Sequence, residues 1–188
     1  MKKLIPLMAM LCVSGLALAQ EKEPPKWGYL QAGYMDFNPD DVAALSDDGW
    51  YAGASFGFLK IVHVFAEYDD IGNYTFWNAG AGVHGLLGEP ADLYAQVKWN
   101  DVKVDTGAGD VSDNGYEIDA GVRWKIVKWF ELQGEVNWAD FDESGDDFGG
   151  KAGVLFSFLG DKLGVGASYE IFNNADQARA FFRWNFGR

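Results

Sequence analysis

Alternate residues along most of this chain fall into two rows, one apolar and the other polar or glycine. The stretch 114–125 reads N-G-Y-E-I-D-A-G-V-R-W-K and shows the pattern most clearly. Its apolar row consists of Tyr116, Ile118, Ala120, Val122 and Trp124. A β-strand places successive side chains on opposite faces, so this pattern predicts a strand with one apolar and one charged face.

The same pattern recurs in ten segments. They cover residues 27–38, 48–58, 61–69, 76–86, 92–104, 114–125, 129–139, 148–158, 162–172 and 178–187. Their apolar rows carry Trp, Tyr or Phe near the ends and small or aliphatic residues between them. In a membrane barrel such rows face lipid, and the aromatic residues form a girdle at each interface. The alternative is a soluble sandwich, in which the apolar rows would form the core.

The connections between the segments favour the membrane barrel. Short turns at 59–60, 87–91, 126–128 and 159–161 alternate with connections that are mostly longer and acidic, about 6 to 14 residues each. The acidic residues in these connections are Asp40, Asp41, Asp47, Asp48, Asp105, Asp110, Asp113, Asp140, Asp142, Glu143, Asp146 and Asp147. Short turns at one end and longer loops at the other are typical of outer-membrane barrels. The sequence therefore predicts an all-β fold, a closed antiparallel up-and-down transmembrane barrel of about ten strands, with eight as the alternative.

The N-terminus predicts export. Lys2 and Lys3 precede an apolar run at 4–18, and Ala17 and Ala19 supply the small residues of a cleavage site before Gln20. We expect a signal peptide at 1–19 and a single barrel domain at 20–188. The only cysteine, Cys12, lies in the signal peptide, so the mature chain is expected to have no disulfide.

Residues 20–188 resemble the small outer-membrane β-barrel proteins of Gram-negative bacteria, the class that includes OmpX- and Ail-like barrels. The resemblance rests on the strand pattern and not on a catalytic motif. OmpX-like barrels have eight strands, whereas ten segments are present here. Many such barrels end in an aromatic residue, but here Phe186 is followed by Gly187 and Arg188. The resemblance implies a monomer in the cell outer membrane, in contact with its lipid and lipopolysaccharide.

The polar rows predict a lumen whose charges nearly balance. Away from the rims they carry six acids and five bases: Glu67, Glu117, Asp119, Glu131, Glu135, Glu170, Lys98, Arg123, Lys151, Arg179 and Arg183. The whole chain has a formal net charge of −13, so the predicted lumen is far closer to neutrality. Because a buried charge needs a partner, this balance predicts an ion-pair network that fills the barrel.

Two functions fit a barrel of this kind. A filled lumen favours a structural or surface-interaction role. Lumen glycines such as Gly121 and Gly166 leave two interpretations open, because they could admit bulky neighbours such as Tyr94 and Arg183 or leave a thin water channel. The second function is therefore a narrow passive channel for small solutes or ions.

Catalytic and cofactor chemistry is only weakly indicated. His63 and Glu67 share a face but stand about 13 Å apart along a strand, so no catalytic residue and no cofactor are predicted. An envelope lipid-modifying enzyme is the remote alternative. The acidic stretches 105–114 and 142–147 offer carboxylates for divalent cations such as Ca²⁺, without EF-hand spacing. The acidic balance argues against nucleic acid as a partner.

Overall fold

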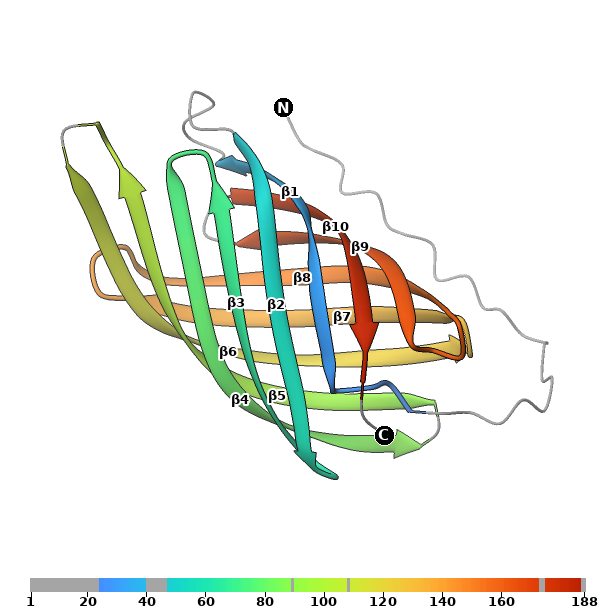
Figure 1. The fold of residues 1–188 in the computed structure, drawn as a ribbon. Helices are drawn as coiled ribbons and strands as arrows, with labels where there is room; N and C mark the ends of the chain where they lie inside the picture. The colour runs from blue at the N-terminus through green and yellow to red at the C-terminus, as the bar shows by residue number, and fades with distance from the viewer. Residues whose placement is uncertain (1–23, 40–46, 89, 108, 173–174, 187–188) are drawn as a thin grey trace, which may run out of the picture.

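Ten antiparallel strands close into one barrel (Figure 1). The computed structural model describes residues 24–39, 47–88, 90–107, 109–172 and 175–186. The strands are β1 (Tyr29–Pro39), β2 (Asp47–Leu59), β3 (Val62–Ile71), β4 (Tyr74–Gly88), β5 (Ala91–Asp105), β6 (Asp110–Val127), β7 (Phe130–Phe141), β8 (Gly145–Phe158), β9 (Leu163–Phe172) and β10 (Ala175–Asn185). The predicted closed, up-and-down topology of ten strands is confirmed, and the alternative of eight strands is wrong. The predicted signal peptide lies outside the described residues.

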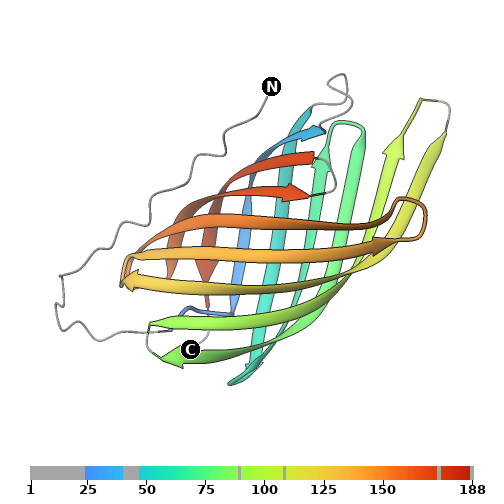
Figure 2. The same ribbon diagram turned by 180° about the vertical axis from the view of Figure 1, so that it is seen from behind.

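Pairing of the first and last strands closes the cylinder. Each strand pairs with its neighbour in sequence, and β1 also pairs with β10 in an unbroken register from Tyr29↔Asn185 to Pro39↔Ala175. Because the number of strands is even, the chain leaves the barrel at the end where it entered. At that end the Phe186 amide donates a hydrogen bond to the Gly28 carbonyl at 2.8 Å. Figure 2 shows the same closed arrangement from behind.

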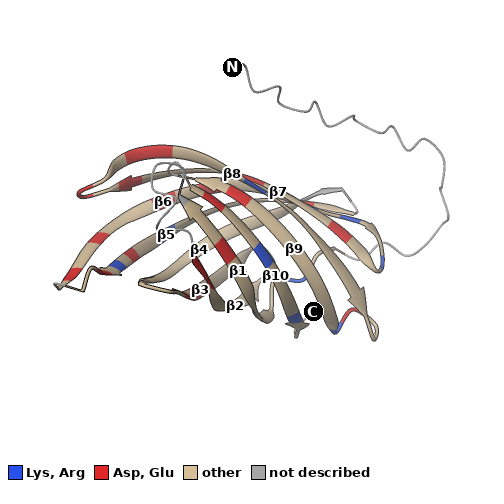
Figure 3. Cartoon of the chain, turned by 90° about the horizontal axis from the view of Figure 1, so that it is seen from above, with Lys and Arg blue, Asp and Glu red and all other residues tan. Residues whose placement is uncertain are grey.

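The two ends of the barrel differ. One end holds the first and last residues of the barrel and the turns after β2, β4, β6 and β8. We call it the terminal end. The opposite end, called the loop end, carries the connections at 40–46, 72–73, 106–109, 142–144 and 173–174. Acidic residues mark the hairpin tips of the loop end in Figure 3.

The outward face is an apolar band between two aromatic girdles. The girdle toward the loop end consists of Tyr34, Trp50, Tyr68, Trp77, Trp99, Tyr116, Trp138, Phe148 and Tyr169, and the girdle toward the terminal end includes Phe56, Phe58, Trp124, Trp129, Phe156, Phe158, Phe182 and Trp184. Trp50 is 50% exposed and Trp184 is 51% exposed. Such large exposed apolar side chains all round a closed barrel are expected where the solvent is lipid. The inward row is the polar one, so the predicted orientation of the two faces is confirmed.

No helix among the described residues is long and apolar enough to cross a membrane.

The connections at the loop end are shorter than predicted, because the strands extend into the acidic stretches. The stretch 105–114 shrinks to a turn at 106–109, and 142–147 shrinks to 142–144. The Gly107 amide donates to Asp105 Oδ1 at 2.8 Å, and the Thr106 hydroxyl donates to the Gly109 carbonyl at 2.7 Å. Short polar side chains that bond the local backbone close tight turns, so strand pairing continues almost to the tip.

Asp113 ties the two longest hairpins together. Its carboxylate accepts hydrogen bonds from the backbone amides of Glu143 and Ser144, each at 3.1 Å, and from the Ser144 hydroxyl at 2.6 Å. The sequence analysis placed this acid in a connection between strands. It lies instead on β6, where it fixes the turn between β7 and β8. Asp40 and Asp41 lie outside the described residues.

The orientation of the two faces can be tested with matched arginine substitutions. Ala120 lies on the outward face of β6, whereas Gln133 lines the lumen. Ala120→Arg should impair insertion strongly, because a charge near the middle of the lipid face costs about 2–4 kcal/mol. Gln133→Arg should insert nearly as well as the unmodified chain. The folded fraction after refolding into lipid vesicles measures both, and equal tolerance at the two positions would contradict the orientation.

Candidate functional site

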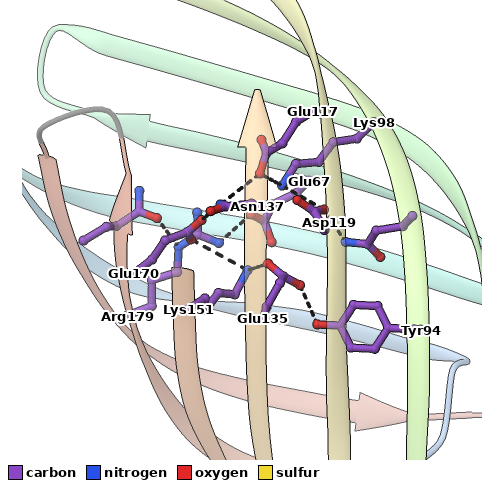
Figure 4. Close-up of polar contacts among 12 residues, drawn as sticks. Glu67, Tyr94, Lys98, Glu117, Asp119, Glu135, Asn137, Lys151, Glu170 and Arg179 are labelled. Carbon is purple, nitrogen blue, oxygen red and sulfur yellow. Dashed lines mark hydrogen bonds and ion pairs between the residues drawn. The ribbon is translucent and has the colours of Figure 1, made fainter. Parts of the chain in front are cut away.

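The lumen holds nearly all the polar side chains that the described strands bury. A layer of nine charged residues crosses it, shown in part in Figure 4. We call this set the charged layer: Glu67, Asp69, Lys98, Glu117, Asp119, Glu135, Lys151, Glu170 and Arg179. Its members come from β3 and from every strand between β5 and β10. Eight of the nine were predicted from the sequence as lumen residues, and Asp69 was not.

Each cation of the charged layer is shared by two carboxylates. Lys98 Nζ lies 2.9 Å from Glu117 Oε1 and 3.5 Å from Asp119 Oδ2. Lys151 Nζ lies 3.2 Å from Glu135 Oε1 and 3.7 Å from Glu170 Oε2.

Arg179 repeats the arrangement with its two terminal nitrogens. Nη1 pairs with Glu67, and Nη2 lies 2.9 Å from Asp69 Oδ2. The planar guanidinium can bond two acceptors at once, so it suits a bridging position between carboxylates.

Neutral side chains connect the ion pairs of Lys98 with those of Lys151 and add further hydrogen bonds. Asn137 Nδ2 donates to Glu117 Oε1 and Glu170 Oε1, both at 3.0 Å, and the Tyr94 hydroxyl donates to Glu135 (Figure 4). Gln96 Nε2 donates to Asp119 Oδ2 at 2.7 Å. Buried charges are stable only when they are paired and hydrogen-bonded, and these amide and hydroxyl groups complete the bonding.

Trp27 fills the lumen near the terminal end. The sequence placed this residue in the first strand, but β1 begins at Tyr29, and the indole is only 7% exposed. Its Nε1 donates to Asp92 Oδ2 at 2.8 Å, and its ring stacks on His63 and His84, with centroids 4.2 and 4.7 Å apart.

Two prolines explain why the first strand starts late. Pro24 and Pro25 have no amide hydrogen to donate to a neighbouring strand, so strand pairing is disfavoured at the start of the segment that carries Trp27. The chain instead folds into the mouth of the barrel, where Ser55 Oγ donates to the Trp27 carbonyl at 2.7 Å.

The basic residues near the terminal end differ in their partners. Arg123 Nε lies 2.7 Å from Glu131 Oε1, and Arg123 Nη1 donates to the Lys26 carbonyl at 2.8 Å. Arg183 has no carboxylate within ion-pairing distance among the described residues. It donates to Gln31 Oε1 at 2.7 Å and lies 4.2 Å from the centre of the Tyr29 ring.

Arg183 was predicted as part of the ion-pair network. The structure places it in the lumen, but held by an amide and an aromatic face. Lys125 pairs with Asp161 at the rim. The sequence did not indicate this pair, because Lys125 lies at the end of a predicted segment and Asp161 lies in a predicted turn.

The two histidines support the Trp27 segment. His63 Nε2 lies 3.2 Å from Gln96 Oε1, and His84 Nδ1 lies 3.1 Å from Asp92 Oδ2. Within the part of the chain that the structure describes, no hydrogen bond joins a serine hydroxyl to either histidine. The same residues contain no group of three His, Cys, Asp or Glu side chains placed to hold a metal ion. The acidic stretches 105–114 and 142–147 therefore form no such site in the residues described.

Glycines make room for the large side chains of the lumen. A Cβ atom on Gly121 would lie 2.5 Å from the Tyr94 ring, and one on Gly166 would lie 2.4 Å from the Phe181 ring. Of the two bulky neighbours expected from the sequence, Tyr94 occupies such a position.

Two cavities lie on either side of the charged layer. The cavity toward the terminal end has a volume of about 100 Å³ and is lined by Trp27, Tyr94 and Arg183 among others. The cavity toward the loop end has about 300 Å³. Glu67, Lys98, Lys151 and Arg179 line both, so the charged layer separates them.

No family model matches the sequence, and no curated protein does. Among solved structures the chain is similar to the KdgM porin, with 8% identity, 84% of this chain and 99% of that chain covered, and a TM-score of 0.49. It is also similar to the N-terminal β-barrel domain of Pseudomonas aeruginosa OprF, with 10% identity, coverage of 85% and 100%, and a TM-score of 0.46. Neisserial surface protein A has 15% identity, coverage of 84% and 96%, and a TM-score of 0.38. The fold assignment rests on the strand pairing of this chain.

The contribution of the shared cations to stability can be tested by removing one of them. Lys151→Met keeps the length of the side chain but leaves Glu135 and Glu170 without their common cation. Removing one partner of a buried pair should lower the free energy of unfolding by about 3–5 kcal/mol. Denaturant unfolding in detergent measures the loss. Lys103→Met, at an exposed position of β5, is the control and should change stability little.

The close packing of Gly121 against the Tyr94 ring gives a second test of the filled lumen. Gly121→Ala should destabilise the barrel by about 1–3 kcal/mol, because the added methyl meets both the Tyr94 ring and the Gly134 carbonyl. Gly85→Ala is the matched control, since no atom lies within 4 Å of a Cβ at that position. Similar unfolding midpoints for the two variants would argue against a tightly filled lumen.

Proposed function

We propose that this protein is a non-conducting barrel of the Gram-negative outer membrane with a structural or surface-interaction role. The observation that carries the proposal is the charged layer, which crosses the lumen with each cation held between two carboxylates. Ions that moved through it would have to break several buried ion pairs, which are costly to separate. Trp27 adds a second obstruction near the terminal end.

The outward face supports the proposed outer-membrane location. An apolar band flanked by aromatic girdles stabilises a barrel in lipid, and the predicted signal peptide would export the chain to reach that membrane. The loop end would then face outward and the terminal end the periplasm. In this orientation the acidic hairpin tips meet the lipopolysaccharide layer and anything that approaches the cell.

A narrow passive channel is the second candidate. It is favoured by the two cavities, of about 100 and about 300 Å³, which leave only the charged layer between them. Rearrangement of a few long side chains, such as Lys151 and Arg179, would join the two spaces. Such a pore would select ions according to the side chains that remain along it.

Conductance in a planar lipid bilayer separates the two candidates. The refolded chain should insert without discrete conductance steps, and a shift in electrophoretic mobility on heating should show that it is folded. A porin in the same bilayer is the positive control. Reproducible steps from this chain would favour the channel, and Arg183→Glu and Glu135→Lys should then change its ion selectivity.

A further inference from the structure

The charged layer is formally short of positive charge. Its three cations, Lys98, Lys151 and Arg179, each serve two carboxylates. Six acids therefore share three bases. The bases Arg123 and Arg183 lie toward the terminal end, on the other side of the layer, so they do not restore the balance on the loop side.

The larger cavity lies directly on this acidic side. It has a volume of about 300 Å³ and extends from the charged layer to Tyr74, Ser144 and Ala175 at the loop end. All three cations of the layer line it, together with four of its carboxylates, namely Glu67, Asp69, Glu117 and Glu170, and Asp101 and Asp113 add two more acids to the wall. Attraction between opposite charges inside a barrel is screened less than in bulk water, so the cavity favours a cation.

The cavity wall above the charged layer is aromatic. Phe37, Tyr74 and Phe76 line one side, with the Phe37 ring 5.6 Å from Tyr74 and 5.8 Å from Phe76. Phe141 and Phe172 line another part, 6.4 Å apart. Strands β4 and β9 stand at opposite positions in the ring of ten strands, so aromatic rings flank the cavity from both sides. The faces of such rings attract cations and also bury apolar groups.

Asp69 provides unused hydrogen-bonding capacity on the wall of the cavity. It is 4% exposed, and its Oδ2 accepts from Arg179 at 2.9 Å. Its Oδ1 is buried and has no hydrogen-bond partner among the described residues. A buried carboxylate oxygen without a donor is costly, so an N–H donor beside Asp69 would stabilise the site.

We propose that this cavity binds a small organic ammonium ion that carries an apolar or aromatic group. The ammonium group would sit against the charged layer and donate to Asp69, and the apolar group would lie between the aromatic rings. A cavity of this volume accommodates a single ring with a short chain. The inference goes beyond the proposed function, because binding at the loop end requires neither conduction nor its absence.

Calorimetric titration of the refolded chain in dodecyl maltoside tests the proposal. The probe is 2-phenylethylammonium, and the matched compounds are 3-phenylpropionate, which has the opposite charge, and neutral 2-phenylethanol. The ammonium ion should bind at least about tenfold more tightly than either, as expected for a charge-assisted hydrogen bond in a buried site. Equal binding of the three compounds, or no binding of the ammonium ion, would overturn the proposal.

Substitutions locate the site. Asp69→Asn should weaken binding of the ammonium ion about tenfold and leave binding of the alcohol unchanged. Asp70→Asn is the control, because it removes the same charge from the next residue of β3, which does not line the cavity. Equal losses in the two variants would refute a role for Asp69.

A second variant tests the cavity without removing the ion pair between Asp69 and Arg179. Phe141→Leu keeps an apolar side chain but removes an aromatic face, so binding of the ammonium ion should weaken while the barrel stays folded and heat-modifiable. Unchanged affinity in this variant would exclude the aromatic wall from the site. Binding of the probe and conductance are measured separately. A conducting barrel that binds the probe can therefore be distinguished from a closed barrel that does not bind it.

Discussion

The pairing of β1 with β10 is the constraint on which the rest of this structure depends. Lipid offers no hydrogen-bond partners, so a sheet that spans a membrane must pair every backbone amide and carbonyl within itself. Closure achieves this and at the same time divides the side chains into two populations. One row of each strand faces lipid and is apolar, and the other row must fit inside a narrow cylinder. The contents of the lumen follow from that second requirement.

Ten strands enclose a lumen that side chains can largely fill, and this chain fills it with charge. Lys98, Lys151 and Arg179 hold carboxylates from several strands together, and Asn137 and Tyr94 complete the hydrogen bonding. These contacts cross the barrel as well as following its wall, so they brace strands that do not pair with one another. Near the terminal end Trp27 has a similar effect through its contacts with His63, His84 and Asp92.

The charge inside the barrel is uneven along its axis, and this unevenness connects the packing to function. Acids exceed bases at the charged layer and continue outward to Asp113 on β6 and Asp105 at a hairpin tip, whereas Arg123 and Arg183 lie toward the terminal end. A molecule approaching from the loop end meets negative charge, then aromatic rings, then paired carboxylates. The proposed binding of an organic cation at the loop end would make use of this gradient.

The sequence by itself indicated a closed barrel of about ten strands, the inner and outer faces of those strands and most of the acids and bases of the lumen. Those features repeat every second residue or follow from the chemistry of single residues, so they can be recognised locally. Only the tertiary structure decided which charges meet, because Arg179 and Glu67 are 112 residues apart and are joined by closure of the barrel. It also showed that Trp27 lies inside the lumen, that Arg183 contacts the Tyr29 ring and the Gln31 amide, and that the acidic connections are short. These outcomes depend on the register between distant strands and on space within the cylinder, and neither is encoded in a short stretch of residues.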